Sequence, residues 1–233
     1  MRDYLLFIDT ETSGLPKKWD VPPSQPNNWP YALQISWKIY TKEGNKVKEE
    51  NHYINEDDFK ITLSSIKIHG ITKDFLSKNG QPRKEVMTLL ANDLIYYKPM
   101  VIGHFLELDT DVTAAEFFRS ALDNPIEKLP CFCIMLATTY LVRNPRAKYL
   151  RLGDLYQTLF NVSQENKHDA LGDVAATAAC FFELVRRGDI NDETIQLQLH
   201  PLPIHEPAFK EKFGWGFYIL LVCLLTALIA HWI

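Results

Sequence analysis

Five side chains in this sequence have the types needed for metal-dependent hydrolysis of a phosphodiester bond. Four are carboxylates and one is a histidine: Asp9, Glu11, Asp109, Asp173 and His168. Carboxylate oxygens are the ligands that Mg²⁺ and related divalent cations prefer in proteins. A histidine ring can take up a proton near neutral pH, as a general base must. These residue types together predict a nuclease that works with divalent metal ions.

The first two carboxylates end an apolar run of strand length. The run begins at Tyr4, and the turn signals Gly14 and Pro16 follow the acidic residues. Because side chains alternate between the faces of a strand, Asp9 and Glu11 project to the same side and can reach one metal centre. Taken alone, such a pair is more often two solvated carboxylates at a strand end, so the interpretation depends on further ligands elsewhere.

The third carboxylate lies at the start of an expected helix. A short apolar strand at 99–102 passes through a Gly-His turn into a segment with apolar residues at helical spacing, and Asp109 falls in its first turn. Glu107 and Asp111 lie beside it. Residues two apart on a helix point about 200° apart, so the three carboxylates cannot all face one site. The alternative interpretation of Glu107 and Asp111 is that they complement the helix dipole.

His168 and Asp173 flank the start of another expected helix. A polar loop at 166–169 leads into an alanine-rich segment, 170–187, with apolar residues three and four apart. Asp169 is suited to cap this helix, which places His168 just before it and Asp173 one turn inside it. A flexible base and a rigidly held ligand could then converge. A lone loop histidine is usually an ordinary surface residue, so this interpretation again depends on the other ligands.

Three segments in this order resemble the exonuclease motifs of the DEDDh family. They are Phe7 to Leu15, then Ile102-Gly103-His104 with Asp109, then His168 with Asp173. The element Ile68-His69-Gly70-Ile71-Thr72 is similar to the His-Gly-Ile-Thr element of the branch that contains the epsilon proofreading subunit of bacterial DNA polymerase III. The resemblance covers Met1 to about Gly188. It implies a ribonuclease H-like α/β fold, in which helices flank a mixed sheet.

The resemblance also implies a mechanism. The expected activity is a 3′-to-5′ exonuclease that releases 5′-mononucleotides from DNA with two divalent ions, Mg²⁺ or Mn²⁺. Asp9 would bridge both ions, and Asp109 would hold one of them. Glu11 and Asp173 would complete the other. His168 would act as the general base. The alternatives are the same chemistry on RNA and a non-catalytic, membrane-tethered nucleic-acid-binding protein.

Further expectations concern how the substrate is held. By the same resemblance, Thr12 would contact the terminal 3′-hydroxyl of a single strand and Leu15 would pack against the last base. The alternative roles are a Thr that caps a turn and a buried Leu. Phe105 departs from the family pattern, because it follows Gly-His where many members have asparagine. It replaces a polar amide next to the site by an aromatic ring.

Basic residues could bind phosphates of the incoming strand. The candidates are Lys17, Lys18, Arg143, Arg146, Lys148 and Arg151. A basic loop is more often simply solvated. The net charge of −4 argues against a protein that coats nucleic acid by bulk electrostatics. It does not argue against an exonuclease, whose metal ions supply positive charge locally.

The C-terminal part predicts a linker and a membrane anchor. Residues 189–212 lose periodicity and carry three prolines, whereas 213–233 contain no acid, lysine or arginine. At a rise of about 1.5 Å per residue, the second segment spans roughly 30 Å, the thickness of a bilayer core. Tryptophan and tyrosine lie near its ends, and Lys210 and Lys212 precede it, which predicts a single-pass anchor with the catalytic domain facing the cytoplasm. The alternative is a core helix packed on the domain.

The cysteines and the N-terminus agree with that location. The four cysteines, Cys131, Cys133, Cys180 and Cys223, lie in apolar surroundings and are expected to be reduced. No signal peptide is expected, because Met1 leads almost directly into the first strand.

The order of elements predicts the fold class. Strands are expected near 4–9, 33–40, 46–54, 100–102 and 131–133, and helices near 84–97, 109–122, 134–142, 152–160 and 170–187. Three leading strands followed by alternating helices and strands favour a mixed α/β sheet with helices on its faces. The loop 17–30, rich in proline and tryptophan, is expected to be rigid and near the active site.

Overall fold

A computed structural model describes residues 1–165 and 167–199 of the chain. The predicted anchor at 213–233 and the end of the predicted linker, 200–212, lie outside the described residues. Within the described part, no helix combines the length and the apolar character needed to cross a bilayer.

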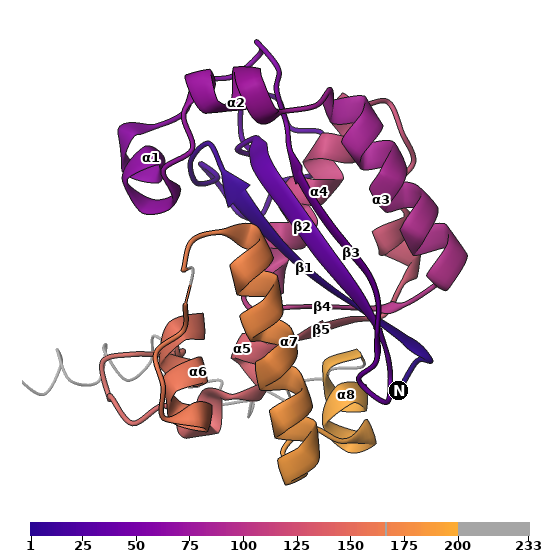
Figure 1. Cartoon of the computed structure of the whole chain (residues 1–233), viewed down its shortest axis with the longest axis vertical. Coiled ribbons are helices and arrows are strands. Elements are labelled where there is room, and N and C mark those ends of the chain that lie inside the picture. Colours follow the sequence, from indigo (N-terminus) through magenta and orange to yellow (C-terminus); the bar gives the residue numbers. More distant parts are fainter. Residues whose placement is uncertain (166, 200–233) are drawn as a thin grey trace, which may run out of the picture. The chain divides into compact units, whose positions relative to one another are not determined.

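Five strands form one mixed sheet in the order β3-β2-β1-β4-β5 (Figure 1). They are β1 (Tyr4–Thr12), β2 (Ala32–Thr41), β3 (Lys46–Tyr53), β4 (Met100–Gly103) and β5 (Cys131–Cys133). The strand β1 pairs antiparallel with β2 and parallel with β4, so β1 and β4 end at the same edge of the sheet. All five strands were expected from the sequence.

Helices cover both faces of this sheet, which confirms the predicted mixed α/β arrangement (Figure 1). One face packs against α3 (Arg83–Tyr97) and α4 (Leu106–Arg119), and the other against α6 (Leu152–Phe160) and α7 (Ala170–Arg187). Within β1, Leu6 and Ile8 face the first pair of helices, and Leu5 and Phe7 face the second. By the same alternation, the side chains at positions 9 and 11 face α7.

Two short helices between β3 and α3 were not predicted. They are α1 (Leu63–His69) and α2 (Lys73–Asn79), capped by Thr62 and Thr72, whose side chains accept hydrogen bonds from amides of the first turn. Gly70 ends α1 with a left-handed backbone, φ 75°. Seven residues make only two turns, too few for a hydrophobic period to stand out. A short 3₁₀ helix, η1 (Pro125–Lys128), follows α4.

The predicted helix at 134–142 is wrong in its second half. It divides into α5 (Ile134–Ala137) and the 3₁₀ turn η2 (Thr139–Leu141). The Thr138 hydroxyl donates to the carbonyl of Ile134 at 2.9 Å, and the backbone leaves the helical region at this residue. A threonine that bonds the preceding turn in this way favours such a break.

The predicted linker is wrong in its first part, because residues Asp192–Leu199 form a helix, α8. Asn191 and Thr194 cap its start with reciprocal hydrogen bonds of 2.8 and 3.0 Å. The Gln198 side chain exchanges two hydrogen bonds with the backbone of Cys133 in β5, and Ile195 is buried. One buried apolar residue in eight gives no visible period. The folded unit therefore continues beyond 188, at least through Leu199.

Candidate active site

The carboxyl end of β1 holds three of the predicted carboxylates together. Asp9 and Glu11 belong to its α7-facing side, whereas Thr10 points to the opposite side. Thr10 donates from its backbone N and from its hydroxyl to one oxygen of Asp109, at 3.0 and 2.8 Å. Asp109 lies in the first turn of α4, as predicted, although this helix begins at Leu106 rather than at 109. Two hydrogen bonds thus fix the start of α4 beside β1.

The start of α7 is fixed by a residue of β2. Asp169 caps α7, as predicted, and its other carboxylate oxygen accepts a hydrogen bond of 2.8 Å from the Gln34 amide. The Gln34 carbonyl oxygen accepts in turn from the backbone N of Ala170 at 3.3 Å. Gln34 is the cross-strand partner of Glu11. The first turn of α7, which contains Asp173, is therefore held next to Glu11.

Three of the predicted residues converge at this point. Glu11, His168 and Asp173 each offer a ligand atom, and these atoms lie within 4.8 Å of one another. The backbone N of His168 donates to Asp173 at 3.3 Å, and His168 has a left-handed backbone with φ 61°. The third segment of the chain therefore meets the first, as the motif interpretation requires.

Burial and mutual repulsion raise the pKa values of the clustered carboxylates. Burial, with repulsion from Asp173 and Asp109, raises the pKa of Glu11 to about 8. Burial raises the pKa of Asp109 to about 7 against the opposing hydrogen bonds from Thr10. The pKa of Asp9 is raised well above its usual value by burial and by the other carboxylates, and burial also raises the pKa of Asp173.

The side chains of this cluster are mostly acidic. Among residues 1–165 and 167–199, no lysine or arginine forms an ion pair with any of the four carboxylates. Oxygen ligands that crowd together without a cationic side chain suit hard divalent cations. The residues present therefore fit the predicted Mg²⁺ or Mn²⁺ ions.

Gln164 is a site residue that sequence analysis missed. Its side chain is 7 % exposed and its amide nitrogen donates to the Asp173 oxygen that His168 does not contact. Gln34, also missed, lies in a strand whose polar and apolar residues alternate, so its residue type does not distinguish it from Ser36 or Lys38. Gln164 lies in an irregular loop, where nothing in the sequence distinguishes it.

A cavity of about 580 Å³ opens beside His168 and Asp173. Its lining includes Gln164, Lys167 and Arg151. Arg151 is therefore the member of the predicted basic group that the structure brings to the site. The other predicted basic residues, Lys17, Lys18, Arg143, Arg146 and Lys148, have exposed side chains.

The two predicted substrate contacts differ in their surroundings. The Thr12 hydroxyl donates to the carbonyl of Gly14 at 2.7 Å, which is the turn-capping alternative. Leu15 is 74 % exposed, so the alternative of a buried leucine is wrong and its side chain is free to meet a base. Contact of either residue with a substrate stays a prediction.

His69 attaches α1 to the end of β1. Its Nδ1 accepts from the backbone N of Ile71 at 3.0 Å, so the ring proton lies on Nε2, which donates to the carbonyl of Thr12 at 3.2 Å. Burial lowers the pKa of His69 and favours this neutral form. Both ring nitrogens of His69 are therefore engaged, and the residue links α1 to β1.

Residues 6–181, three quarters of the chain, match the exonuclease family. The chain therefore belongs to this family, and the prediction of an exonuclease is confirmed at that level. No curated protein matches the sequence.

Solved structures of exonuclease I have a similar fold. The E. coli enzyme in complex with a dT13 oligonucleotide is 22 % identical, with a TM-score of 0.64, over 79 % of this chain and 41 % of that one. A product-bound exonuclease I is 19 % identical, with a TM-score of 0.66, over 84 % and 46 %. A zinc-bound complex of the E. coli enzyme with single-stranded DNA is 21 % identical, with a TM-score of 0.65, over 84 % and 42 %. The chain spans less than half the length of these proteins.

Proposed function

We propose that this chain is a 3′-to-5′ exonuclease that removes 5′-mononucleotides from single-stranded DNA. The observation that carries the proposal is the convergence of Glu11, Asp173 and His168 from separate segments of an exonuclease-family fold. The solved complexes of exonuclease I with a dT13 oligonucleotide and with zinc and single-stranded DNA support the choice of substrate and the need for a metal. The assignment of this chain to the epsilon-type branch of the family rests on residues 68–72 alone.

In the proposed reaction, the four carboxylates act as metal ligands and the histidine acts as the base. Asp9, Glu11, Asp109 and Asp173 would hold the two divalent ions. Such ions stabilise the negative charge of the attacking and leaving oxygens during in-line displacement at phosphorus. The His168 ring takes a proton from the attacking water. The new P–O bond forms to that water, the bond to the 3′-oxygen of the preceding nucleotide breaks, and the terminal nucleotide leaves with a 5′-phosphate.

The test uses the full chain in detergent with Mg²⁺ or Mn²⁺ and 5′-end-labelled single strands of DNA and RNA. We expect DNA to shorten stepwise from its 3′ end. Stepwise shortening of RNA alone would instead support an exoribonuclease. Cleavage of neither would contradict the proposal and support a non-catalytic binding protein. His168→Ala is expected to lower the rate at least about a hundredfold, as loss of a general base does.

We also propose that residues 213–233 anchor the protein in a membrane, with the exonuclease unit on the cytoplasmic side. The support is the uncharged apolar sequence and the position of Lys210 and Lys212 before it. The test compares the full chain with a chain ending at 212 by membrane flotation after an alkaline wash. The full chain is expected to float with the membranes and the shorter chain to stay soluble. Equal behaviour of the two chains would contradict the anchor.

A further inference from the structure

Two aromatic side chains, Trp19 and Phe105, form a pair in the segments that follow β1 and β4, the parallel strands that end at the same edge of the sheet. Their ring centroids are 5.5 Å apart and their planes are inclined by 41°. Trp19 also packs edge-on against the buried Trp29, with centroids 6.2 Å apart. Trp19 nevertheless stays 42 % exposed, and Phe105 is partly exposed. The aromatic pair is therefore supported by a buried ring and open to solvent.

The loop that carries Trp19 is held in place by hydrogen bonds. The Asn28 side chain exchanges two hydrogen bonds of 2.9 Å with the backbone of Lys18. The indole nitrogen of Trp29 donates to the carbonyl of Pro22 at 3.0 Å. These three bonds close the loop on itself on either side of Trp19, which agrees with the rigid loop expected from its sequence.

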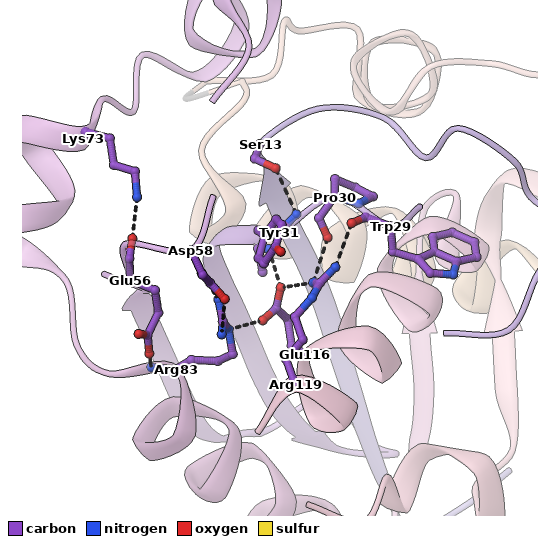
Figure 2. Close-up of polar contacts among 11 residues, drawn as sticks. Ser13, Trp29, Pro30, Tyr31, Glu56, Asp58, Lys73, Arg83, Glu116 and Arg119 are labelled. Atoms are coloured by element: carbon purple, nitrogen blue, oxygen red, sulfur yellow. Dashed lines mark hydrogen bonds and ion pairs between the residues drawn. The ribbon is translucent and has the colours of Figure 1, made fainter. Parts of the chain in front are cut away.

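The same loop is fastened to α4, the helix that contains Asp109. Figure 2 shows Arg119 of α4 donating to the carbonyls of Trp29 and Pro30, at 2.7 and 3.0 Å. Arg119 is paired with Glu116, which is fully buried and also faces Arg83. Movement of the loop relative to α4 would break these bonds and leave donors of the partly buried Arg119 guanidinium unsatisfied, which is costly. The position of Trp19 is thus coupled to the helix that supplies a site carboxylate.

Phe105 occupies an unusual backbone position. It directly precedes α4, four residues before Asp109, and its φ of 68° is left-handed. Bulky residues rarely adopt this conformation, whereas asparagine accepts it more readily. A phenylalanine at this position has a less favourable backbone conformation than an asparagine would have, but its ring contacts Trp19.

We propose that Trp19 and Phe105 form a stacking surface for an unpaired nucleobase near the 3′ end of the substrate strand. This inference rests on the proposed function, and it adds a specificity-determining subsite to it. Stacking on aromatic rings tolerates every base, because each base has a π-face. It requires a base that is not already stacked in a duplex. The pair therefore selects single strands over duplex ends, and it does not distinguish one base from another.

The test measures binding of a labelled single-stranded oligothymidylate by fluorescence anisotropy in Mg²⁺, in the His168→Ala background to prevent cleavage. Trp19→Ala and Phe105→Asn are each expected to weaken binding about tenfold, within the range for a lost base stack. Trp19→Phe should retain most of the affinity. Phe118→Ala is the matched control, because Phe118 is an exposed aromatic residue near the other end of α4 and should leave binding unchanged.

A second measurement alters the oligonucleotide as well as the aromatic pair. Each oligonucleotide carries one abasic nucleotide, placed at successive positions from the 3′ end. Its affinity is measured for the chain that keeps both aromatic residues and for the Trp19→Ala variant. At one position near the 3′ end, we expect the missing base to lower the affinity about tenfold when Trp19 is present. In the Trp19→Ala variant, the missing base at that position should leave the affinity unchanged. Equal affinity for all abasic positions, or binding by the Trp19→Ala and Phe105→Asn variants as tight as that of the chain with both aromatic residues, would overturn the inference.

The outcomes separate this inference from the proposed function. Cleavage of DNA by the unaltered chain, with binding insensitive to Trp19 and Phe105, overturns the stacking surface alone. Absence of cleavage, with binding that depends on Trp19, overturns the exonuclease proposal and leaves the stacking surface standing. Absence of any binding overturns both.

Discussion

Both carboxylate oxygens of Asp173 are held by neighbouring protein groups. One accepts from the Gln164 amide and the other from the backbone N of His168. A metal ligand oriented in this way loses little freedom when the ion binds, and groups that orient ligands typically affect metal affinity or activity 10- to 100-fold. We therefore expect Gln164 to affect metal binding without being a ligand itself.

Gln164→Leu is expected to lower the rate about tenfold at limiting Mg²⁺. The rate should recover in part at high Mg²⁺, because the change disturbs the ligand Asp173 and leaves the base His168 intact. The measurement is the rate of single-strand shortening as a function of Mg²⁺ concentration. Gln157→Leu is the control, because Gln157 is exposed on the neighbouring helix α6. An unchanged Mg²⁺ dependence in Gln164→Leu would show that Gln164 does not position Asp173.

Among the elements, α8 extends the folded unit past the predicted boundary. Its buried residue Ile195 packs in the same cluster as α7, and its exposed residue Leu197 does not. Ile195→Ala is expected to lower the free energy of unfolding by about 2–4 kcal/mol, whereas Leu197→Ala should change it by less than about 0.5 kcal/mol. Urea denaturation of the two variants checks this. Similar small effects in both would mean that α8 does not stabilise the domain.

The elements that the sequence predicted are those with a strong local signal. β1 begins with a continuous apolar run, β2 alternates apolar and polar residues from Leu33 to Ile39, and α7 has eighteen residues with a clear period. The helices α1, α2 and α8 depend instead on caps and on contacts with distant strands, such as that of Gln198 with Cys133. Such contacts join residues 65 positions apart, so a local pattern does not reveal them.

The same division holds within the site. The two-residue spacing in β1 predicted that Asp9 and Glu11 share a face, because strand geometry alone decides it. The bond between Gln164 and Asp173, and the pairing of Trp19 with Phe105, depend on how loops fold back in three dimensions. Their residue types carry no spacing rule that could have shown these contacts in advance.

For the whole molecule, the clustered carboxylates make stability depend on pH. The pKa of Glu11 rises to about 8 and that of Asp109 to about 7, from ordinary values of 4.5 and 3.8. At pH values between the ordinary and the raised pKa values, these carboxyl groups hold protons in the folded protein that they have lost in the unfolded chain. The free energy of unfolding contributed by these groups therefore falls as pH rises from about 5 to 8.

We accordingly expect the metal-free protein to melt at a lower temperature at pH 8 than at pH 5.5. Mg²⁺ at pH 8 should recover the loss, because ions that bind only the folded state stabilise it. Calorimetric melting curves with and without Mg²⁺ measure both effects. Glu11→Gln should flatten the pH dependence. A melting temperature that rises with pH in the metal-free protein would contradict the assigned pKa shifts.

Carboxylates from three distant segments are expected to bind divalent cations together, and titration calorimetry with Mn²⁺ at pH 8 measures that binding. We expect uptake of about two ions per chain by the unaltered protein and loss of that uptake in the Asp9→Asn, Asp173→Ala double variant. Absence of Mn²⁺ binding by the unaltered protein, or equal binding by the double variant, would contradict it.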